Sequence, residues 1–521
     1  MPKENGGAIV MPNLPSTRAS EKPIIKSVSS NKLSPIALLR LCGWEENAVL
    51  LDGSMGGWFE GAFSLVGGQP FGIFQSNGRS ARFDYLRAHH RRSFYSVGDP
   101  AASLEYWLER FEIKKKNNPV SSNIPFLFGG TVGFLSYDLI RQFETIPPPR
   151  KEDTNTPDIA LLFLNFFLLI DHLNEVIHIV FNPLPEIQMG GDKTAVCKAG
   201  QEKIDAIAFT ISNTDLRDDP QPPFFSIKVD TDCTAEGYIE MVRRAKKYIS
   251  SGDIFQANLS HRFTAPYPYE SLLGLYHRMC ALNPSPFASY IDFKGIQIAS
   301  NSPERLVRVT KEQGKHIVET RPIAGTKPRG ENRSEDEILV RSLNTSSKER
   351  AEHLMLIDLG RNDLGKICRY GSISVDSMMA TEKYSHVSHL VSNIRGELLE
   401  GTSALQIIQA LFPGGTITGV PKIRCMEIIS ELENHARGIY TGAIGYIGFD
   451  GEIDLNIAIR TCVRYGHTIQ YQVGAGIVAD SDPLMEYEET LHKATAFLKT
   501  IDPSYHAAAA ERSSPDVGLP E

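Results

Sequence analysis

Hydrophobic residues recur at helical spacing in several stretches of the second half of the chain. The clearest stretch is Ala235–Ser251, whose apolar side chains fall on one face and which Gly252 follows directly. This spacing predicts an amphipathic helix that ends at the glycine. The same pattern predicts helices at about 199–209 and at Ser334–Ser342, Ser347–Leu356, Ala404–Leu411, Lys422–Leu432 and Leu484–Thr500, and a serine at a capping position opens the helix at 347.

Runs of β-branched, aromatic and aliphatic residues predict strands between these helices. The longest apolar run, Ile159–Ile170 (IALLFLNFFLLI), is flanked by Pro157 and Asp171 and is too short to cross a bilayer, which takes ~20 residues. We expect it to be one buried strand. Further strands are expected at Asp292–Ala299 and Leu306–Val309, and an antiparallel meander at Ala443–Phe449, Glu452–Cys462 and Gln470–Val473. This mixed order of strands and helices predicts an α+β fold.

Shifts in composition divide the chain into four parts. Residues 1–35 mix Lys, Pro, Ser and Asn without an apolar block, so we expect a loose leader and no signal peptide. The polar, proline-rich stretch Asn213–Pro223 is the best internal boundary. We therefore predict an N-terminal region over 36–222, a catalytic domain over 223–503 and a flexible tail over 504–521.

Composition excludes several functional classes. A hydrophobic content of 41% with 22% charged residues is typical of a water-soluble globular protein. The formal charge of -8 argues against a nucleic-acid partner and against an anionic membrane surface. The seven cysteines are scattered and form no disulfide or zinc pattern, which favours a reducing, cytoplasmic setting.

Two pairs of glutamates are the first candidates for chemistry. Glu349 and Glu352 are three residues apart in a predicted helix, and so are Glu486 and Glu489. Residues at this spacing share one helix face. Such pairs are most often solvated surface groups, but two facing pairs would offer the oxygen ligands that Mg²⁺ prefers.

Glycines gather with threonine and lysine in three further segments. Glycine lets the backbone approach a ligand closely and exposes N–H groups that bind anions. None of the segments is a phosphate-binding loop of known pattern. They are Pro322–Thr326, Pro413–Lys422 and Gly474–Gly476. Together with the glutamate pairs, these segments indicate an anionic ligand held with a metal.

Seven segments, in order along the chain, resemble the chorismate-utilising enzymes, specifically the synthase subunits of anthranilate synthase and aminodeoxychorismate synthase. These segments cover most of residues 230–500, and GGTVGFLSYD near residue 130 resembles the family more loosely. They are GDIFQANLSHRF (252–263), SPERLVRV (302–309), ETRPIAGTKPRG (319–330), KERAEHLMLIDLGRNDLG (348–365), FPGGTITGVPKIRCMEII (412–429), YTGAIGYIGFDGEIDLNIAIRT (440–461) and GAGIVADSDPLMEYEETLHKA (474–494). The resemblance implies a large composite sandwich of antiparallel sheets packed with helices.

The resemblance also implies a role for individual residues. Glu352 and Glu489 would hold Mg²⁺ at the ring carboxylate of chorismate, with Glu349 and Glu486 as supporting partners. The implied catalytic residues are His389, Glu304 and Thr416. The residues that would surround the substrate are Gly325, Thr326, Lys422, Tyr440, Arg460, Gly474, Ala475 and Gly476.

The implied reaction needs a source of ammonia. Mg²⁺ would act as a Lewis acid on the ring carboxylate while ammonia adds to the ring and the 4-hydroxyl leaves. None of the seven cysteines lies in a Gly-x-Cys-x-Gly segment of the kind that hydrolyses glutamine. A separate glutamine amidotransferase subunit is therefore the expected partner, and free ammonium is its expected substitute.

The sequence carries conflicting signals about the product. Ala324 stands where many aminodeoxychorismate synthases have a lysine, which resembles anthranilate synthase. Asn258, Arg305 and the segments around TGVPKIRCM and DLNIAIRT resemble the aminodeoxychorismate branch. We expect 4-amino-4-deoxychorismate as the product, with anthranilate plus pyruvate as the alternative. A subunit that only senses chorismate or an amino acid is the alternative from another class.

Overall fold

The computed structural model describes residues 21–30, 33–87, 91–113, 124–152, 155–214, 223–293, 295–330, 332–383 and 387–505. Most of the predicted leader, nearly all of the predicted tail and most of the predicted internal boundary lie outside these ranges. Among the described residues, no helix is long and apolar enough to cross a membrane.

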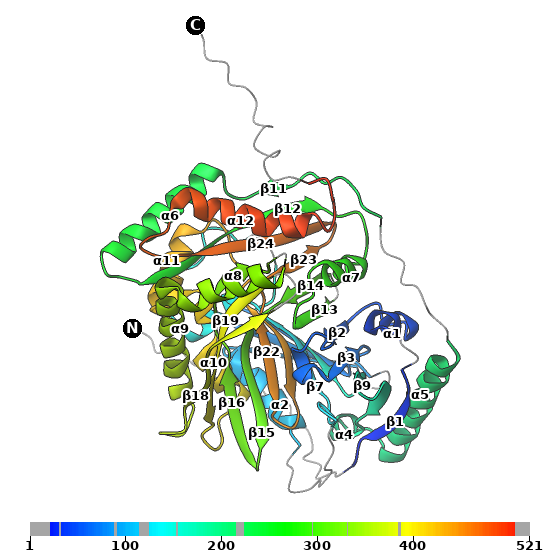
Figure 1. Cartoon of the computed structure of the whole chain (residues 1–521). Coiled ribbons are helices and arrows are strands. Elements are labelled where there is room, and N and C mark those ends of the chain that lie inside the picture. The colour runs from blue at the N-terminus through cyan, green and yellow to red at the C-terminus, as the bar shows by residue number, and fades with distance from the viewer. Residues whose placement is uncertain are drawn as a thin grey trace.

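Two large antiparallel sheets form the centre of the molecule (Figure 1). The first sheet has the order β1 (Ile24–Ser29), β10 (Val176–Phe181), β9 (Phe166–Asp171), β3 (Phe63–Gly67), β2 (Ala48–Asp52), β13 (Phe287–Phe293), β14 (Ile296–Ser302), β23 (Thr461–Tyr465), β24 (Thr468–Ile477), β12 (Gln256–Pro266) and β11 (Asp230–Thr231), and β20 (Gly419–Val420) pairs with β12.

The second sheet also combines strands that are distant in sequence. Its order is β17 (Ile323–Pro328), β19 (Val387–Glu397), β16 (Lys315–Thr320), β15 (Arg305–Glu312), β22 (Ile453–Ile457), β21 (Ala443–Gly448), β7 (Gly130–Leu135), β8 (Ile159–Leu164), β4 (Gly72–Asn77), β5 (Ser80–Tyr85) and β6 (Arg92–Val97), and β18 (Ser374–Lys383) pairs with β19. Both sheets contain strands from either side of residue 222, and the boundary there stays a prediction.

Side chains that alternate between the two faces of the central strands are buried on both faces of the sheets. In β2, Val49 and Leu51 contribute to the core between the sheets, whereas Ala48 and Leu50 contribute to a second core on the opposite face. Successive strand side chains point to opposite faces, so a fully apolar strand requires cover on both sides. Helices α1 (Pro35–Leu41), α5 (Lys193–Asn213), α7 (Leu273–Leu282) and α12 (Pro483–Leu498) supply buried residues to this second core.

Two groups of helices lie around the strands that carry the predicted site. Helices α6 (Ala235–Ser250) and α11 (Lys422–Leu432) form a third apolar core with β12, β24 and α12 (Figure 1). Helices α8 (Arg333–Thr345) and α9 (Ser347–Gly365) pack on β17 and β19. The remaining helices are α2 (Pro100–Phe111), α3 (Ile140–Phe143), α4 (Leu184–Gln188) and α10 (Ala404–Leu411), with short 3₁₀ turns η1 (Trp58–Gly61), η3 (Tyr137–Leu139) and η4 (Gly415–Ile417).

The structure confirms the α+β class and the antiparallel sheets, but it corrects three predicted strands. The run 159–170 is two strands, β8 and β9, which belong to different sheets and meet at Asn165. The buried Asn165 side-chain amide donates to the Asn182 carbonyl at 3.0 Å. The polar residue thus has a hydrogen-bond partner at the corner where the chain passes from one sheet to the other. The predicted strand 452–462 is likewise β22 and β23 in different sheets. The predicted meander is therefore divided between both layers.

The third corrected strand, predicted over 292–299, spans the turn between β13 and β14. The other predicted elements differ mainly in their ends. The helix expected at 199–209 extends over Lys193–Asn213, and the one expected at 347–356 continues to Gly365. The predicted helices 404–411 and 422–432 have the same bounds as α10 and α11.

Candidate active site

Glu304 lies in the turn between β14 and β15, and its backbone binds the end of β22. Its carbonyl accepts from the Ile457 amide at 3.0 Å, and its side chain is buried. Burial raises the pKa of this carboxyl to about 7, and the Thr416 hydroxyl is the largest opposing influence. The Thr416 hydroxyl is itself buried and makes no well-oriented hydrogen bond. Glu304 is therefore a carboxylic acid that changes charge near neutral pH.

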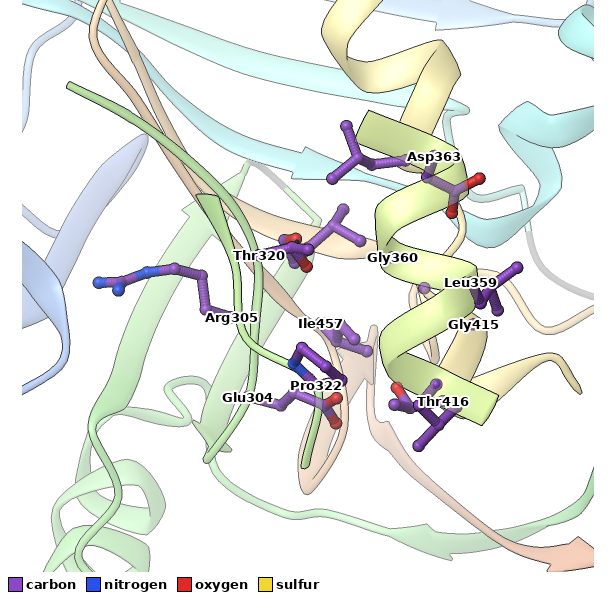
Figure 2. A pocket seen from close by; sticks show the side chains of 14 residues that line it. Glu304, Arg305, Thr320, Pro322, Leu359, Gly360, Asp363, Gly415, Thr416 and Ile457 are labelled. Carbon is purple, nitrogen blue, oxygen red and sulfur yellow. Dashed lines mark hydrogen bonds between the residues drawn. The ribbon is translucent and has the colours of Figure 1, made fainter. Parts of the chain in front are cut away.

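A narrow cavity of about 40 Å³ extends from Glu304 along the inner face of α9. Figure 2 shows Glu304, Pro322 and Thr416 at one end of this pocket and Asp363 at the other. Leucines of α9, Ile457 and the glycines at 414 and 415 complete its wall. The cavity gives Glu304 an apolar environment, which accounts for the direction of its pKa shift.

Arg460 lies where the chain crosses from β22 in the second sheet to β23 in the first. Its backbone has φ of 50°, in the left-handed region, and its carbonyl accepts from the Asn301 amide at 3.1 Å. Burial lowers the pKa of the guanidinium, and Tyr471 and Glu304 oppose that shift. A half-buried cation near Glu304 is suited to a ligand carboxylate.

His389 lies on β19, opposite Thr326 of β17 in the strand register. Its Nδ1 lies 3.3 Å from the Gly325 carbonyl, an acceptor, so Nδ1 carries the hydrogen. Burial lowers the pKa of the ring, and nearby Arg460 lowers it further. His389 is therefore a neutral imidazole at physiological pH, with the tautomer fixed by its backbone partner.

Gly325 brings β17 against the first glutamate pair. The register between β17 and β19 shifts between Ala324 and Thr326, and Gly325 has φ of 64°. A Cβ atom at this position would lie 2.7 Å from Glu349 Oε2. Glycine thus allows the irregular backbone and leaves room for the carboxylate of α9.

The other glycine segment lies on β24 beside β12. A Cβ atom at Gly474 would lie 2.7 Å from Asn258 Oδ1 and 2.9 Å from the Tyr440 hydroxyl. A Cβ atom at Gly476 would lie 2.7 Å from the Gln256 side-chain nitrogen, while Ala475 between them is buried in the third core. Asn258 Oδ1 is buried and makes no hydrogen bond. The two glycines therefore leave room for the polar side chains of Asn258 and Gln256.

The second glutamate pair lies on α12, next to the same strand. Glu489 forms an ion pair with Lys493 at 2.7 Å, and the Lys493 amine donates to the Gly474 carbonyl at 2.9 Å. Glu486 and Glu489 both contribute to raising the pKa of buried Tyr238, after burial and Tyr440. The α12 pair thus lies near the Gly474 and Tyr440 side of the site, as the α9 pair lies near Gly325.

The structure does not gather the four glutamates into one cluster. Across the described ranges, no group of three or more His, Cys, Asp and Glu side chains is arranged to hold a metal ion. Carboxylate oxygens on two elements do fit Mg²⁺, which takes one or two protein carboxylates together with water and an anionic substrate. The donor chemistry is thus suitable, provided that a ligand carboxylate completes the site.

Lys422 has other partners than the predicted substrate. Its amine forms an ion pair with Asp363 of α9 at 2.7 Å and donates to the carbonyls of Leu411 and Pro413 at 3.0 and 3.1 Å. These three contacts use all three hydrogens of the ammonium group. The structure therefore gives Lys422 a tethering role between α9 and α11.

Two residues beside the site were missed by the sequence analysis. Asp363 lines the cavity with Glu304, and Arg437 forms a buried ion pair with Glu433 behind Tyr440. The spacing of Glu433 and Arg437, four residues apart, was a signal of an ion pair. Both residues lie beyond the end of the predicted helix 422–432, so the helical spacing rule was not applied to them.

Comparison with known proteins places this arrangement in a family. A family model described as chorismate binding enzyme matches residues 73–499. Anthranilate synthase component 1 from Acetivibrio thermocellus is 36% identical, covering 92% of this chain and 95% of its own. Aminodeoxychorismate synthase component 1 from Bacillus subtilis (strain 168) is 37% identical, covering 93% and 98%.

Solved structures agree with the fold. Anthranilate synthase component I from Streptococcus pneumoniae TIGR4 has a TM-score of 0.71 and 32% identity, covering 84% of this chain and 92% of its own. The menaquinone-specific isochorismate synthase from Escherichia coli has a TM-score of 0.66 at 15% identity, covering 93% and 97%. The second likeness supports the fold alone.

Proposed function

The chain belongs to the chorismate binding enzyme family, and from this premise we propose that it aminates chorismate with ammonia to 4-amino-4-deoxychorismate. Its relatives make it an enzyme of the anthranilate and aminodeoxychorismate synthase type. The observation that carries the proposal is the buried Glu304 carboxyl, whose pKa is about 7 and which shares Arg460 as a charged neighbour with His389. Such a group can give a proton to a departing hydroxyl at neutral pH.

The chain's own groups account for the main steps. Arg460 binds a carboxylate of the chorismate dianion, and the backbone at Gly325 and Gly474 admits the ring. Glu304 protonates the 4-hydroxyl, which leaves as water, so that in the product a carbon–nitrogen bond from ammonia replaces the carbon–oxygen bond at C4. Neutral His389 accepts the proton that the new ammonium group must lose. The balance is chorismate plus ammonia to aminodeoxychorismate plus water.

Mg²⁺ is part of this proposal. Glu352 and Glu489 would hold the ion, supported by Glu349 and Glu486. When bound, the metal would hold the ring carboxylate and withdraw electron density from the ring. Its donors lie on α9 and α12, the two helices that border the Gly325 and Gly474 segments.

A glutamine amidotransferase subunit is the proposed source of ammonia. The relatives are named component 1, which implies a second component. All seven cysteines of this chain are free thiols, and none lies between glycines as a glutamine-hydrolysing nucleophile would. A reducing, cytoplasmic setting is part of the same proposal.

Anthranilate is the second candidate product. The two curated relatives differ by one percentage point of identity, so similarity favours neither product. Ala324 favours anthranilate because it offers no amine to add at C2. In that reaction ammonia remains at C2, and loss of the enolpyruvyl group as pyruvate makes the ring aromatic.

The test is turnover of chorismate by the purified full chain with Mg²⁺ and ammonium chloride. Products are separated by chromatography and mass, with and without added aminodeoxychorismate lyase. We expect 4-aminobenzoate only when the lyase is present. Fluorescent anthranilate as the main product without lyase would select the second candidate. No consumption of chorismate, with and without an amidotransferase, would leave only the non-catalytic sensing role.

A further inference from the structure

Arg437 is a buried arginine whose five N–H donors all have acceptors. Nε donates to Glu433 Oε2 at 2.9 Å, and Nη2 donates to Glu433 Oε1 at 2.7 Å. Nη2 also donates to the Asn258 carbonyl at 2.7 Å, and Nη1 donates to the Ile417 carbonyl at 2.9 Å and to Thr441 Oγ1 at 3.3 Å. The guanidinium has five N–H donors in a fixed planar geometry, so none is left without an acceptor.

Glu433 balances the charge and extends the network to β12. Its Oε1 accepts from the amide and from the hydroxyl of Ser260, each at 2.8 Å. The Arg437 and Glu433 side chains are 1% and 4% exposed. The pair therefore carries no net charge, and Arg437 is not a second anchor for an anionic substrate.

Two tyrosine rings enclose the guanidinium. Its carbon lies 4.9 Å from the centre of the Tyr137 ring and 5.7 Å from the centre of the Tyr440 ring. The Tyr440 hydroxyl lies 2.9 Å from the place that a Cβ atom at Gly474 would take. One face of this tyrosine thus contacts Arg437, while its hydroxyl borders the proposed substrate space.

Each segment bound by Arg437 continues into the proposed site. Ile417 follows Thr416, whose hydroxyl lies beside Glu304. Asn258 is opposite Gly476 in the register of β12 and β24. Arg437 therefore joins the Tyr440 segment to the η4 turn and to β12, which is distant in the sequence.

From this arrangement, and resting on the proposed function, we infer that Arg437 is a positioning residue for chorismate amination. It acts by fixing Thr416, Tyr440 and the β12–β24 backbone relative to one another. Three carbonyl or hydroxyl acceptors and one carboxylate need a planar fork, so charge alone does not fulfil this role.

The decisive variant is Arg437→Lys. Lysine keeps the charge that Glu433 requires but offers three donors and no planar fork. We expect a folded protein whose kcat falls about 100-fold, the scale of a misplacement near 1 Å. The KM for chorismate should change much less than kcat, because Arg460 remains. The matched control is Arg244→Lys, which changes an exposed arginine paired with Glu431 of α11, and wild-type kinetics are expected.

A second variant separates positioning from folding. Glu433→Gln with Arg437→Met removes both charges, so no charge is left buried without a partner, and such replacements are often tolerated. We expect a melting temperature near that of the wild type and a kcat as low as that of Arg437→Lys. Wild-type kcat in either folded variant, or a rise in KM alone, would overturn the inference. Failure of the wild-type chain itself to consume chorismate would instead contradict the proposed function.

Discussion

Glu304, His389 and Arg460 acquire their chemical character from burial, and irregular backbone lies next to each of them. Arg460 lies at a crossover with positive φ, and His389 faces a shifted register at Gly325. Their identities followed from resemblance, because no spacing in the sequence connects residues 304, 389 and 460. Asp363 and Arg437 were missed because their importance depends on partners that only tertiary packing supplies.

At this scale, Glu304 predicts how stability depends on pH. Its pKa of about 7 exceeds the ordinary 4.5, so the folded state holds a proton that the unfolded chain releases between these values. The resulting stability is fully present below pH 4.5 and is lost as pH rises through 7. The free energy of unfolding of Glu304→Gln should therefore exceed that of the wild type by up to about 3 kcal/mol at pH 8. At pH 4 the two free energies should be nearly equal. Urea unfolding of both proteins at pH 4 and at pH 8 measures this difference. The same difference in stability at both pH values would contradict the prediction.

The same titration predicts the pH profile of activity. Because the protonated Glu304 is the proposed acid, kcat/KM for chorismate should fall as pH rises above about 7. Glu304→Gln should lose most of the activity, and the activity that remains should no longer fall near pH 7. A wild-type profile that stays flat from pH 6 to 9 would remove Glu304 from this role.

The glutamate pairs predict a difference between neighbouring residues of α12. Glu489→Gln, and likewise Glu352→Gln on α9, should raise the Mg²⁺ concentration for half-maximal turnover at least about tenfold. Glu488→Gln changes an exposed neighbour and serves as the control. Calorimetric titration of Mg²⁺ in the presence of chorismate measures binding independently of turnover. Unchanged Mg²⁺ binding in Glu352→Gln and Glu489→Gln would exclude both as ligands.

Helices α10 and α11, which begin after a capping residue or a proline, were predicted with correct bounds. Helix α10 begins at a capping box formed by Ser403 and Gln406, and α11 follows Pro421, so their ends agreed with the sequence pattern. Helix α9 was cut short because its second half includes Gly360, an unfavourable helix residue. A Cβ atom at Gly360 would lie 2.6 Å from Ile394 Cδ1, so close packing on β19 requires the glycine there.

The tether between α9 and α11 gives a prediction at the scale of elements. Lys422→Met would remove the main partner of buried Asp363 and should destabilise the fold by about 2–4 kcal/mol. Lys366→Met removes a second partner whose side chain is 53% exposed, and should cost under about 1 kcal/mol. Denaturant unfolding of both variants provides the comparison. Equal losses would show that the buried contact is no stronger than the exposed one.

The whole molecule depends on pairing between strands that lie far apart in the sequence. Strand β2 pairs with β13, and β7 pairs with β21. The sequence indicated the strands and the α+β class, but it could not indicate these partners. Hydrophobic runs that cross from one sheet to the other look continuous, since both layers are buried.

This pairing predicts the behaviour of a fragment over residues 223–505. Without the first 222 residues, β13 loses β2 and β21 loses β7, so two apolar central strands become exposed edges. The fragment should be found in the insoluble fraction when expressed alone, whereas the full chain should stay in the supernatant. Sedimentation of lysates and size-exclusion chromatography measure the outcome. A monomeric fragment with cooperative unfolding would show that the predicted catalytic domain is independent.

The β7–β21 pair also sets the timing of folding during synthesis. Leu135 is opposite Ala443 in the register, and ribosomes add about 5–20 residues per second. The apolar strand around residue 135 therefore waits roughly 15–60 s for its neighbour to be made. Throughout that interval the nascent chain presents an incomplete sheet, which makes it a natural client for chaperones that shield unpaired strands.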